Sequence, residues 1–177
     1  MPRQMDLQSS PDNRTSTQIP NIRRLCVYCG SSGAVDRQYR EAAVELGTRL
    51  AAAGVGLVYG GGRVGLMGLL ADAALAAGGV VTGIIPARLR DAELAHHGAM
   101  ELIVVDSMHE RKRLMAEKAD AFAILPGGVG TLDEMFEILS WKQLHLHDKA
   151  ILLVDIGGYR FKRNACTAQQ GLPGGTF

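Results

Sequence analysis

The segment at residues 125–137, LPGGVGTLDEMFE, puts a glycine-rich loop directly before a helical pattern rich in carboxylates. A glycine loop at a helix start can turn backbone N–H groups toward an anion, and the helix dipole adds about 0.3–1 kcal/mol. The missing Cβ atoms leave room for a phosphate to approach the backbone. We therefore predict a nucleotide phosphate site formed by Gly127, Gly128, Val129, Gly130 and Thr131.

Two interpretations of Glu134 follow from its spacing. Thr131 and Glu134 have the spacing of a capping box, in which the threonine caps the helix and the glutamate bonds back to it. Alternatively, Glu134 and Glu137 share one helix face and would point away from the phosphate, toward the sugar and base attached to it. The residue pattern leaves both interpretations open.

A second cluster, SMHERKRLM at residues 107–115, supplies positive charge. Arg111 can donate two hydrogen bonds to a phosphate or carboxylate, and Lys112 offers a compact charge. A solvated basic helix start is the alternative, although basic residues at a helix N-terminus oppose the dipole. Because successive helical residues diverge by about 100°, Arg113 is predicted to face solvent.

Short β-rich runs alternate with helical patterns from residue 22 onward, and the runs are continuously apolar. Strands buried on both faces have this pattern, and the alternation predicts an α/β, Rossmann-like parallel sheet with helices on both faces. The expected strands are residues 25–29, 54–60, 80–85, 101–105, 121–125 and 150–156. With 177 residues, we expect a single domain at 22–159, after a disordered arm at 1–21.

Three glycine-rich segments end expected strands, which is where ligands bind in such sheets. They are CGSSG, YGGGRVG and PGGVGT, and we predict substrate contacts from Ser31 and Gly61 in the first two. The middle segment also fits G-x-G-x-x-G, but the next strand ends without the acidic residue that a dinucleotide site needs, so NAD is disfavoured. A tight strand–helix turn remains the alternative for these glycines, and no P-loop motif is present.

Composition narrows the class of protein further. A net charge of +1 gives no general case for binding nucleic acid or an anionic membrane. The residues contain no apolar run of membrane-span length and no signal-peptide core, so we expect a cytoplasmic protein. Cys26 and Cys29 lie on one expected strand and should point to opposite faces, which favours buried thiols over a redox or metal pair. His145 and His147 lack a third ligand at helical spacing, so no metal site is predicted.

The motifs CVYCGSS, VYGGGRVGLMG, SMHERKRLM and PGGVGTLDEMFEILSWKQL together resemble the LONELY GUY (LOG) family of cytokinin riboside 5'-monophosphate phosphoribohydrolases, often mislabelled as lysine decarboxylases. The resemblance covers residues 22–159 and implies a homodimeric enzyme. Its reaction would hydrolyse the N-glycosidic bond of N6-modified AMP, or AMP itself, to the free base and ribose 5-phosphate. It also implies that Arg111 and Glu134 are the catalytic pair, that Lys112 and residues 128–131 bind the nucleotide, and that Glu93 in ELAH is a further ligand.

The resemblance implies no metal or redox cofactor, and no lysine is marked as a pyridoxal phosphate ligand for a decarboxylase. A nucleotide- or cofactor-binding carrier of the same fold is the alternative function, and the charge balance disfavours a basic interaction module. Residues 160–177 depart from the family pattern. They read FKRNACTAQQGLPGGTF after Arg160 and are expected to be a truncated or frameshifted tail without the usual final helix.

Overall fold

One parallel sheet of six short strands organises the described part of the chain in this computed structural model, which comprises residues 21–90, 92, 95–96 and 101–157. The strands are β1 (Arg24–Tyr28), β2 (Gly56–Tyr59), β3 (Val81–Pro86), β4 (Glu101–Val105), β5 (Ala121–Ile124) and β6 (Ala150–Leu153). The helices are α1 (Arg37–Ala52), α2 (Gly65–Ala76), the short α3 (Ala87–Leu89), α4 (Met108–Lys118) and α5 (Val129–Gln143).

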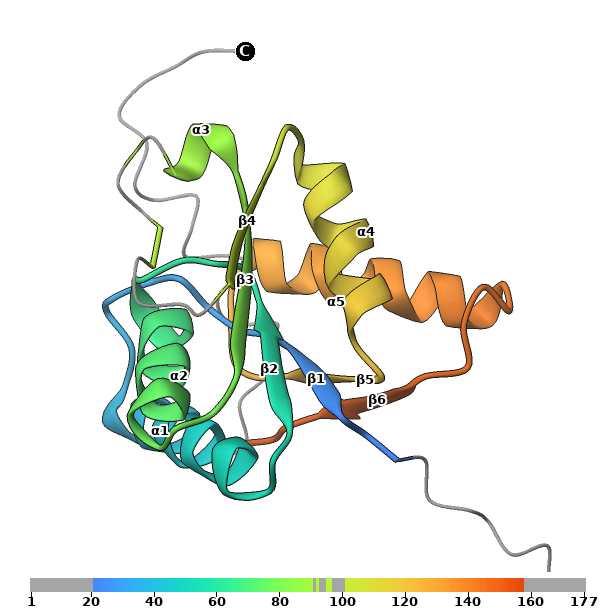
Figure 1. Ribbon diagram of the computed structural model, residues 1–177. Coiled ribbons are helices and arrows are strands. Elements are labelled where there is room, and N and C mark those ends of the chain that lie inside the picture. The colour runs from blue at the N-terminus through green and yellow to red at the C-terminus, as the bar shows by residue number, and fades with distance from the viewer. Residues whose placement is uncertain (1–20, 91, 93–94, 97–100, 158–177) are drawn as a thin grey trace, which may run out of the picture.

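The strand order is β4-β3-β2-β1-β5-β6, and every neighbouring pair is parallel. Helices α1 and α2 lie on one side of the sheet, and α4 and α5 lie on the other (Figure 1). The α/β, Rossmann-like fold with helices on both faces is therefore confirmed. Each expected strand appears within two or three residues of its predicted bounds.

The central strand β1 shows why the strands read as continuous apolar runs. Leu25, Val27 and Cys29 pack with α1 and α2, whereas Cys26 and Tyr28 pack with α4 and α5. Both thiols are free and buried on opposite faces, as predicted. Burial raises the pKa of the Cys26 and Cys29 thiols far above the ordinary value, so both stay protonated and unreactive.

The strand order reverses between β1 and β5. The sheet continues from β1 through β2 and β3 to β4 on one side, and through β5 to β6 on the other. Loops from three strand ends meet at this point. The Gly30 N–H donates to the Pro126 carbonyl (3.0 Å), and the Gly30 carbonyl accepts from the Leu66 N–H (3.0 Å). The glycine segments after β1, β2 and β5 are thus brought together, as expected for a ligand site at the carboxyl edge of a parallel sheet.

Several sequence predictions fall outside this description. Glu93, Cys166, residues 1–20 of the expected arm and the whole expected tail at 160–177 lie outside the described residues. Among the helices of the described residues, none has the length and apolarity needed to cross a bilayer.

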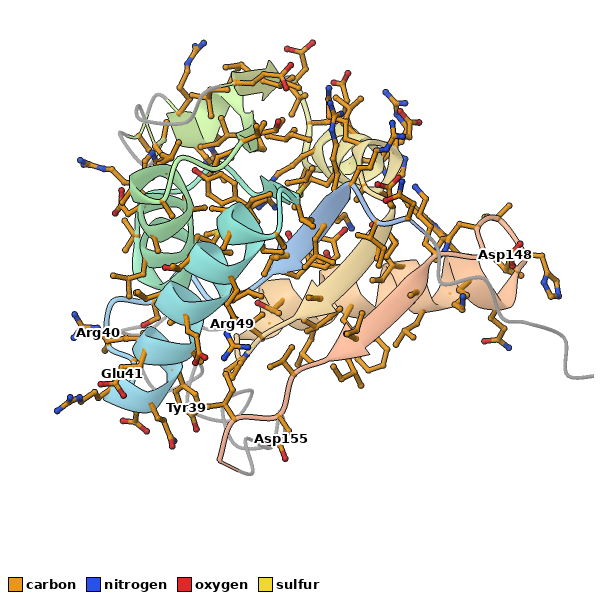
Figure 2. All side chains as sticks on the ribbon, turned by 60° about the horizontal axis from the view of Figure 1, so that its bottom comes forward. Tyr39, Arg40, Glu41, Arg49, Asp148 and Asp155 are labelled. Carbon is orange, nitrogen blue, oxygen red and sulfur yellow. The ribbon has the colours of Figure 1, made fainter. Side chains whose placement is uncertain are left out.

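Helices α1 and α2 approach each other closely at Gly47, while Arg40, Glu41 and Arg49 project from the exposed face of α1 (Figure 2). A Cβ at Gly47 would overlap the Leu70 carbonyl oxygen and lie 3.0 Å from the Ala74 nitrogen. Both obstructing atoms are backbone atoms, so they cannot move aside without shifting α2.

We expect Gly47→Val to lower the free energy of unfolding by about 1–3 kcal/mol, because overpacking forces the two helices apart. Urea denaturation would measure the loss. Gly33→Ala is the matched control, since a Cβ there meets no atom within 4 Å. Equal stability of Gly47→Val and the wild type would contradict the close helix contact.

Candidate functional site

A buried ion pair joins α4 to α5 beneath the glycine loop. Nη1 of Arg111 donates to Oε1 of Glu134 at 2.8 Å, and each side chain is 9% exposed. Two charges removed from water are tolerated only when they are paired and their remaining donors are satisfied. The two residues that the family resemblance names as the catalytic pair are therefore in direct contact.

Two backbone carbonyls and the Met108 sulfur accept further hydrogen bonds from the Arg111 guanidinium. Nε donates to the Ile84 carbonyl of β3 at 3.1 Å, and Nη2 donates to the Gly60 carbonyl after β2 at 3.4 Å. A Cβ at Gly60 would overlap Nη2, so glycine is required for this approach. Sequence reasoning missed the contributions of Ile84 and Gly60 to the site, because a backbone acceptor has no residue signature.

The start of α4 sets the position of Arg111. The Ser107 hydroxyl accepts a hydrogen bond from the Glu110 N–H at 3.1 Å and caps the helix. Glu110 accepts a hydrogen bond from the Asp106 N–H at 3.4 Å, so its side chain holds the residue before the cap and not the cap N–H that a capping box would use. Arg111 lies one helical turn after the Ser107 cap, on the buried face of α4.

Of the two interpretations of Glu134 left open by the sequence, the capping box with Thr131 is wrong. Helix α5 begins at Val129 with Gly128 as its N-cap, three residues before the predicted start. Thr131 consequently lies inside the first turn and is buried, with its side chain beside Gly127. Glu134 is one turn too far along to reach the cap and bonds Arg111 instead. A glycine at the N-cap is sterically free to leave the helix geometry, so no threonine cap is needed.

Lys112 forms a second link between α4 and α5. Its Nζ lies 3.0 Å from Asp133 Oδ2 and 3.1 Å from Glu137 Oε2. Burial works to lower the pKa of Lys112, but the hydrogen bonds that its ammonium donates to Asp133 and Glu137 outweigh burial and raise the pKa. Lys112 therefore remains charged and neutralises carboxylates beside the predicted phosphate site. Arg113 is exposed and pairs with Glu117 on its own helix, as expected for a solvated residue.

Burial raises the pKa of Glu134 above its ordinary value, while the Arg111 charge and hydrogen bond act in the opposite direction. Burial therefore favours the protonated form of the Glu134 carboxyl, whereas Arg111 favours its ionised form. Carboxyl groups with opposed influences of this kind are typical of acid–base sites. The arrangement can deliver a proton acceptor to a ligand lying over the start of α5.

The remaining predicted contacts fall into two groups. Ser31, Gly128, Val129 and Gly130 are exposed around the start of α5 and the neighbouring loop. Gly61 is buried, and its carbonyl accepts from the His96 N–H at 2.9 Å. The first group is placed to meet a ligand directly, whereas Gly61 is placed to shape the loop.

Of the two histidines after α5, His147 has a structural role, while His145 is exposed. His147 Nε2 lies 3.0 Å from the Ile138 carbonyl, and Nδ1 accepts from the Lys149 N–H at 3.2 Å. These contacts occupy both ring nitrogens. Within residues 21–157, as far as they are described, no three histidine, cysteine or acidic side chains gather as metal ligands.

Comparison with known proteins shows which family the chain belongs to. Residues 67–164, more than half of the chain, match the family described as "Possible lysine decarboxylase". The chain belongs to this LOG family. A relative from Rhodococcoides fascians, named cytokinin riboside 5'-monophosphate phosphoribohydrolase, is 46% identical over 157 residues, covering 88% of this chain and 79% of the relative.

A rice relative, from Oryza sativa subsp. japonica, is named "Probable cytokinin riboside 5'-monophosphate phosphoribohydrolase LOGL9" and is 51% identical over 138 residues. The match covers 78% of this LOG-family chain and 61% of the rice protein, so the chain spans less than two thirds of that relative's length. A solved structure of the molybdenum cofactor carrier protein from Chlamydomonas reinhardtii shares the fold, with a TM-score of 0.64, 22% identity and 84% of each chain covered.

The buried pair predicts an asymmetric response to mutation. We expect Arg111→Met to cost about 3–5 kcal/mol at pH 7, because it leaves the Glu134 carboxylate buried and unpaired. The double variant Arg111→Met with Glu134→Leu should lose less, since no buried charge remains. Denaturant titrations of the single and double variants would measure the two losses.

The same pair gives a pH signature with a definite sign. Removing Arg111 raises the pKa of Glu134 further above its unfolded value, since Arg111 is what lowers it. The penalty in Arg111→Met is then full above the raised pKa and shrinks as pH falls toward the unfolded value. A penalty that does not change between pH 7 and pH 5, or a double variant less stable than the single one, would contradict the buried ion pair.

Proposed function

We propose that the protein hydrolyses the N-glycosidic bond of N6-modified adenosine 5'-monophosphates, releasing the free base and ribose 5-phosphate. The observation that carries this proposal is the buried contact between Arg111 and Glu134, one helical turn below the glycine loop at the start of α5. The names of the rice and Rhodococcoides relatives support the substrate class. AMP is proposed as a second, simpler substrate.

The loop supplies the phosphate site in this proposal. Gly128, Val129 and Gly130 begin α5 and are exposed, and the first N–H groups of a helix have no acceptor within the helix. A phosphate placed there receives these hydrogen bonds and the favourable end of the helix dipole. The sugar attached to it would then extend toward Glu134, which follows one turn later.

Glu134 performs the acid–base step. As a carboxylate it accepts a proton from water while the water oxygen bonds to C1' of the ribose and the bond from C1' to the base nitrogen breaks. The departing base takes up a proton, so one water is consumed and no other reactant is needed. The sugar becomes positively charged in the transition state, and a carboxylate nearby stabilises it. Arg111 keeps Glu134 ionised before the step.

A homodimer is part of the same proposal. Two large apolar side chains of α5 face outward, with Phe136 60% exposed and Leu139 37% exposed. Burial against a second copy would remove this area from water, which supports association through α5.

Turnover is tested by product analysis. We expect the purified protein to release free base and ribose 5-phosphate from isopentenyl-AMP, with AMP assayed alongside, and Glu134→Gln to lower the rate by about 10²–10⁴-fold. The amide has the size of the carboxyl but cannot take the proton. Nucleotide binding that persists in Glu134→Gln, together with no release by the wild type, would identify a carrier instead of a hydrolase.

The glycine loop gives a second test that separates binding from stability. A Cβ at Gly130 or Gly128 meets no protein atom within 4 Å, whereas a Cβ at Gly127 would overlap Thr131. We expect Gly130→Ala to keep or raise the unfolding free energy, because alanine is favoured inside a helix, yet to weaken AMP binding at least tenfold. Gly127→Ala should instead lower stability. Calorimetric titration with AMP would measure the affinity of each variant. An unchanged affinity in Gly130→Ala would mean that the phosphate binds elsewhere.

A further inference from the structure

The three glycines after β2 connect two separate parts of the protein. The Gly60 carbonyl accepts from Nη2 of Arg111 at 3.4 Å, and the Gly61 carbonyl accepts from the His96 N–H at 2.9 Å. Gly62 forms an antiparallel bridge with Ala95. A single loop therefore touches the catalytic pair on one side and the backbone of residues 95–96 on the other.

The side chain of His96 is fixed in turn by α2. Its Nε2 lies 2.9 Å from Oδ1 of Asp72, and the imidazole is 9% exposed, whereas the Asp72 side chain is 69% exposed. A carboxylate oxygen can only accept, so Nε2 carries the proton and donates. The edge of the buried Tyr59 ring packs against the imidazole, with centroids 6.5 Å apart and planes at 83°. We call the contact between His96 and Asp72 the clasp.

The glycine loop needs such support. Gly61 has φ +72°, in the left-handed region, and glycines lose more conformational freedom on folding than any other residue. A loop of three glycines has no side chains of its own to hold it, so contacts from neighbouring residues must fix its carbonyls. The clasp supplies one set of these contacts, because it secures the backbone that bonds to Gly61 and Gly62.

We propose that the His96–Asp72 clasp is a positioning device for Arg111, an inference that rests on the proposed hydrolase function. By fixing the loop, the clasp holds the Gly60 carbonyl where it directs the Arg111 guanidinium at Glu134. Among the bonds described, those of the His96 and Asp72 side chains go to each other and not to Arg111 or Glu134, and the proposed phosphate site lies on another element, at the start of α5. Losing the clasp is therefore expected to lower kcat while nucleotide affinity stays unchanged.

The experiment compares variants that break the clasp with variants that preserve it. His96→Leu removes the donor, and Asp72→Ala removes the acceptor at a largely exposed position where no core cavity is created. His96→Gln and Asp72→Asn keep a donor amide or an acceptor oxygen near the original atoms. Glu41→Gln is the control, because Glu41 pairs with Arg37 on the exposed face of α1 (Figure 2).

Three quantities are measured for each variant: kcat with isopentenyl-AMP, the Kd for AMP in Glu134→Gln background protein, and the NMR signal of the Arg111 Nε–H, assigned by its loss in Arg111→Lys. We expect kcat to fall on the order of tenfold to a hundredfold in His96→Leu and Asp72→Ala, as for a misplaced catalytic group. The Arg111 signal should shift and broaden, and the Kd should stay within about twofold of the control, since the phosphate grip is separate. The two conservative variants should recover most of the rate.

Unchanged kcat and an unchanged Arg111 signal in His96→Leu would overturn the proposal. A parallel loss of AMP affinity would also overturn it, because His96 would then act on the ligand directly. If the wild type releases no base, the proposed function fails on its own, and the Arg111 signal alone decides whether the clasp positions that side chain.

Discussion

The site depends on one electrostatic constraint, which is that Arg111 and Glu134 are both buried and must satisfy each other. Separating either from its partner would leave a charge in a poorly hydrated interior. Arg111 also donates to the Ile84 carbonyl within β3 and to the Gly60 carbonyl after β2, so the guanidinium is bonded to the sheet as well as to α5. The side chain of Arg111 consequently connects α4 with α5, with β3 and with the residue after β2.

Glycine serves two different purposes around this pair. At Gly60 and Gly127 the absent Cβ lets parts of the protein itself pack together, since a side chain would overlap Arg111 or Thr131. At Gly128 and Gly130 a Cβ would meet no protein atom, so packing gives no reason for glycine there. Gly128 is the N-cap, where glycine is well accepted, but inside the first turn Gly130 even lowers stability relative to alanine. A glycine at position 130 is what the proposed phosphate site would require, because the phosphate would approach the backbone there.

The fold could be predicted because its signals are local. Apolar runs depend on neighbouring residues, and they located β1 and β2 to within two residues. The site was harder, since Arg111 and Glu134 are 23 residues apart and their contact depends on how α4 and α5 pack. Residue spacing left Glu134 between a cap and a functional group, and the family resemblance supplied the pairing that the structure then displays.

Other parts of the site had no sequence signal at all. The Ile84 carbonyl could belong to any residue type, and the glycine required at position 60 is equally explained by a tight turn, so nothing in the sequence marks either carbonyl as a partner of Arg111. The start of α5 was misplaced for a related reason. Threonine followed three residues later by glutamate is a valid cap pattern, and it competed with a glycine cap that makes no side-chain hydrogen bond. The side-chain cap that the structure does contain, from the Ser107 hydroxyl to the Glu110 N–H, occurs in a sequence of the same spacing.

The charge balance at the start of α5 explains how carboxylates can lie beside the proposed phosphate site. Asp133, Glu134 and Glu137 carry three negative charges, and Arg111 and Lys112 carry two positive ones in direct contact with them. Most of the repulsion toward a phosphate is thereby cancelled, which leaves its binding to backbone N–H groups and the helix dipole. One negative charge remains in excess. In the proposed reaction this excess negative charge stabilises the transition state, because the sugar gains positive charge as its bond to the base breaks. The ribose of the bound substrate is neutral, so the same charge stabilises the ground state much less.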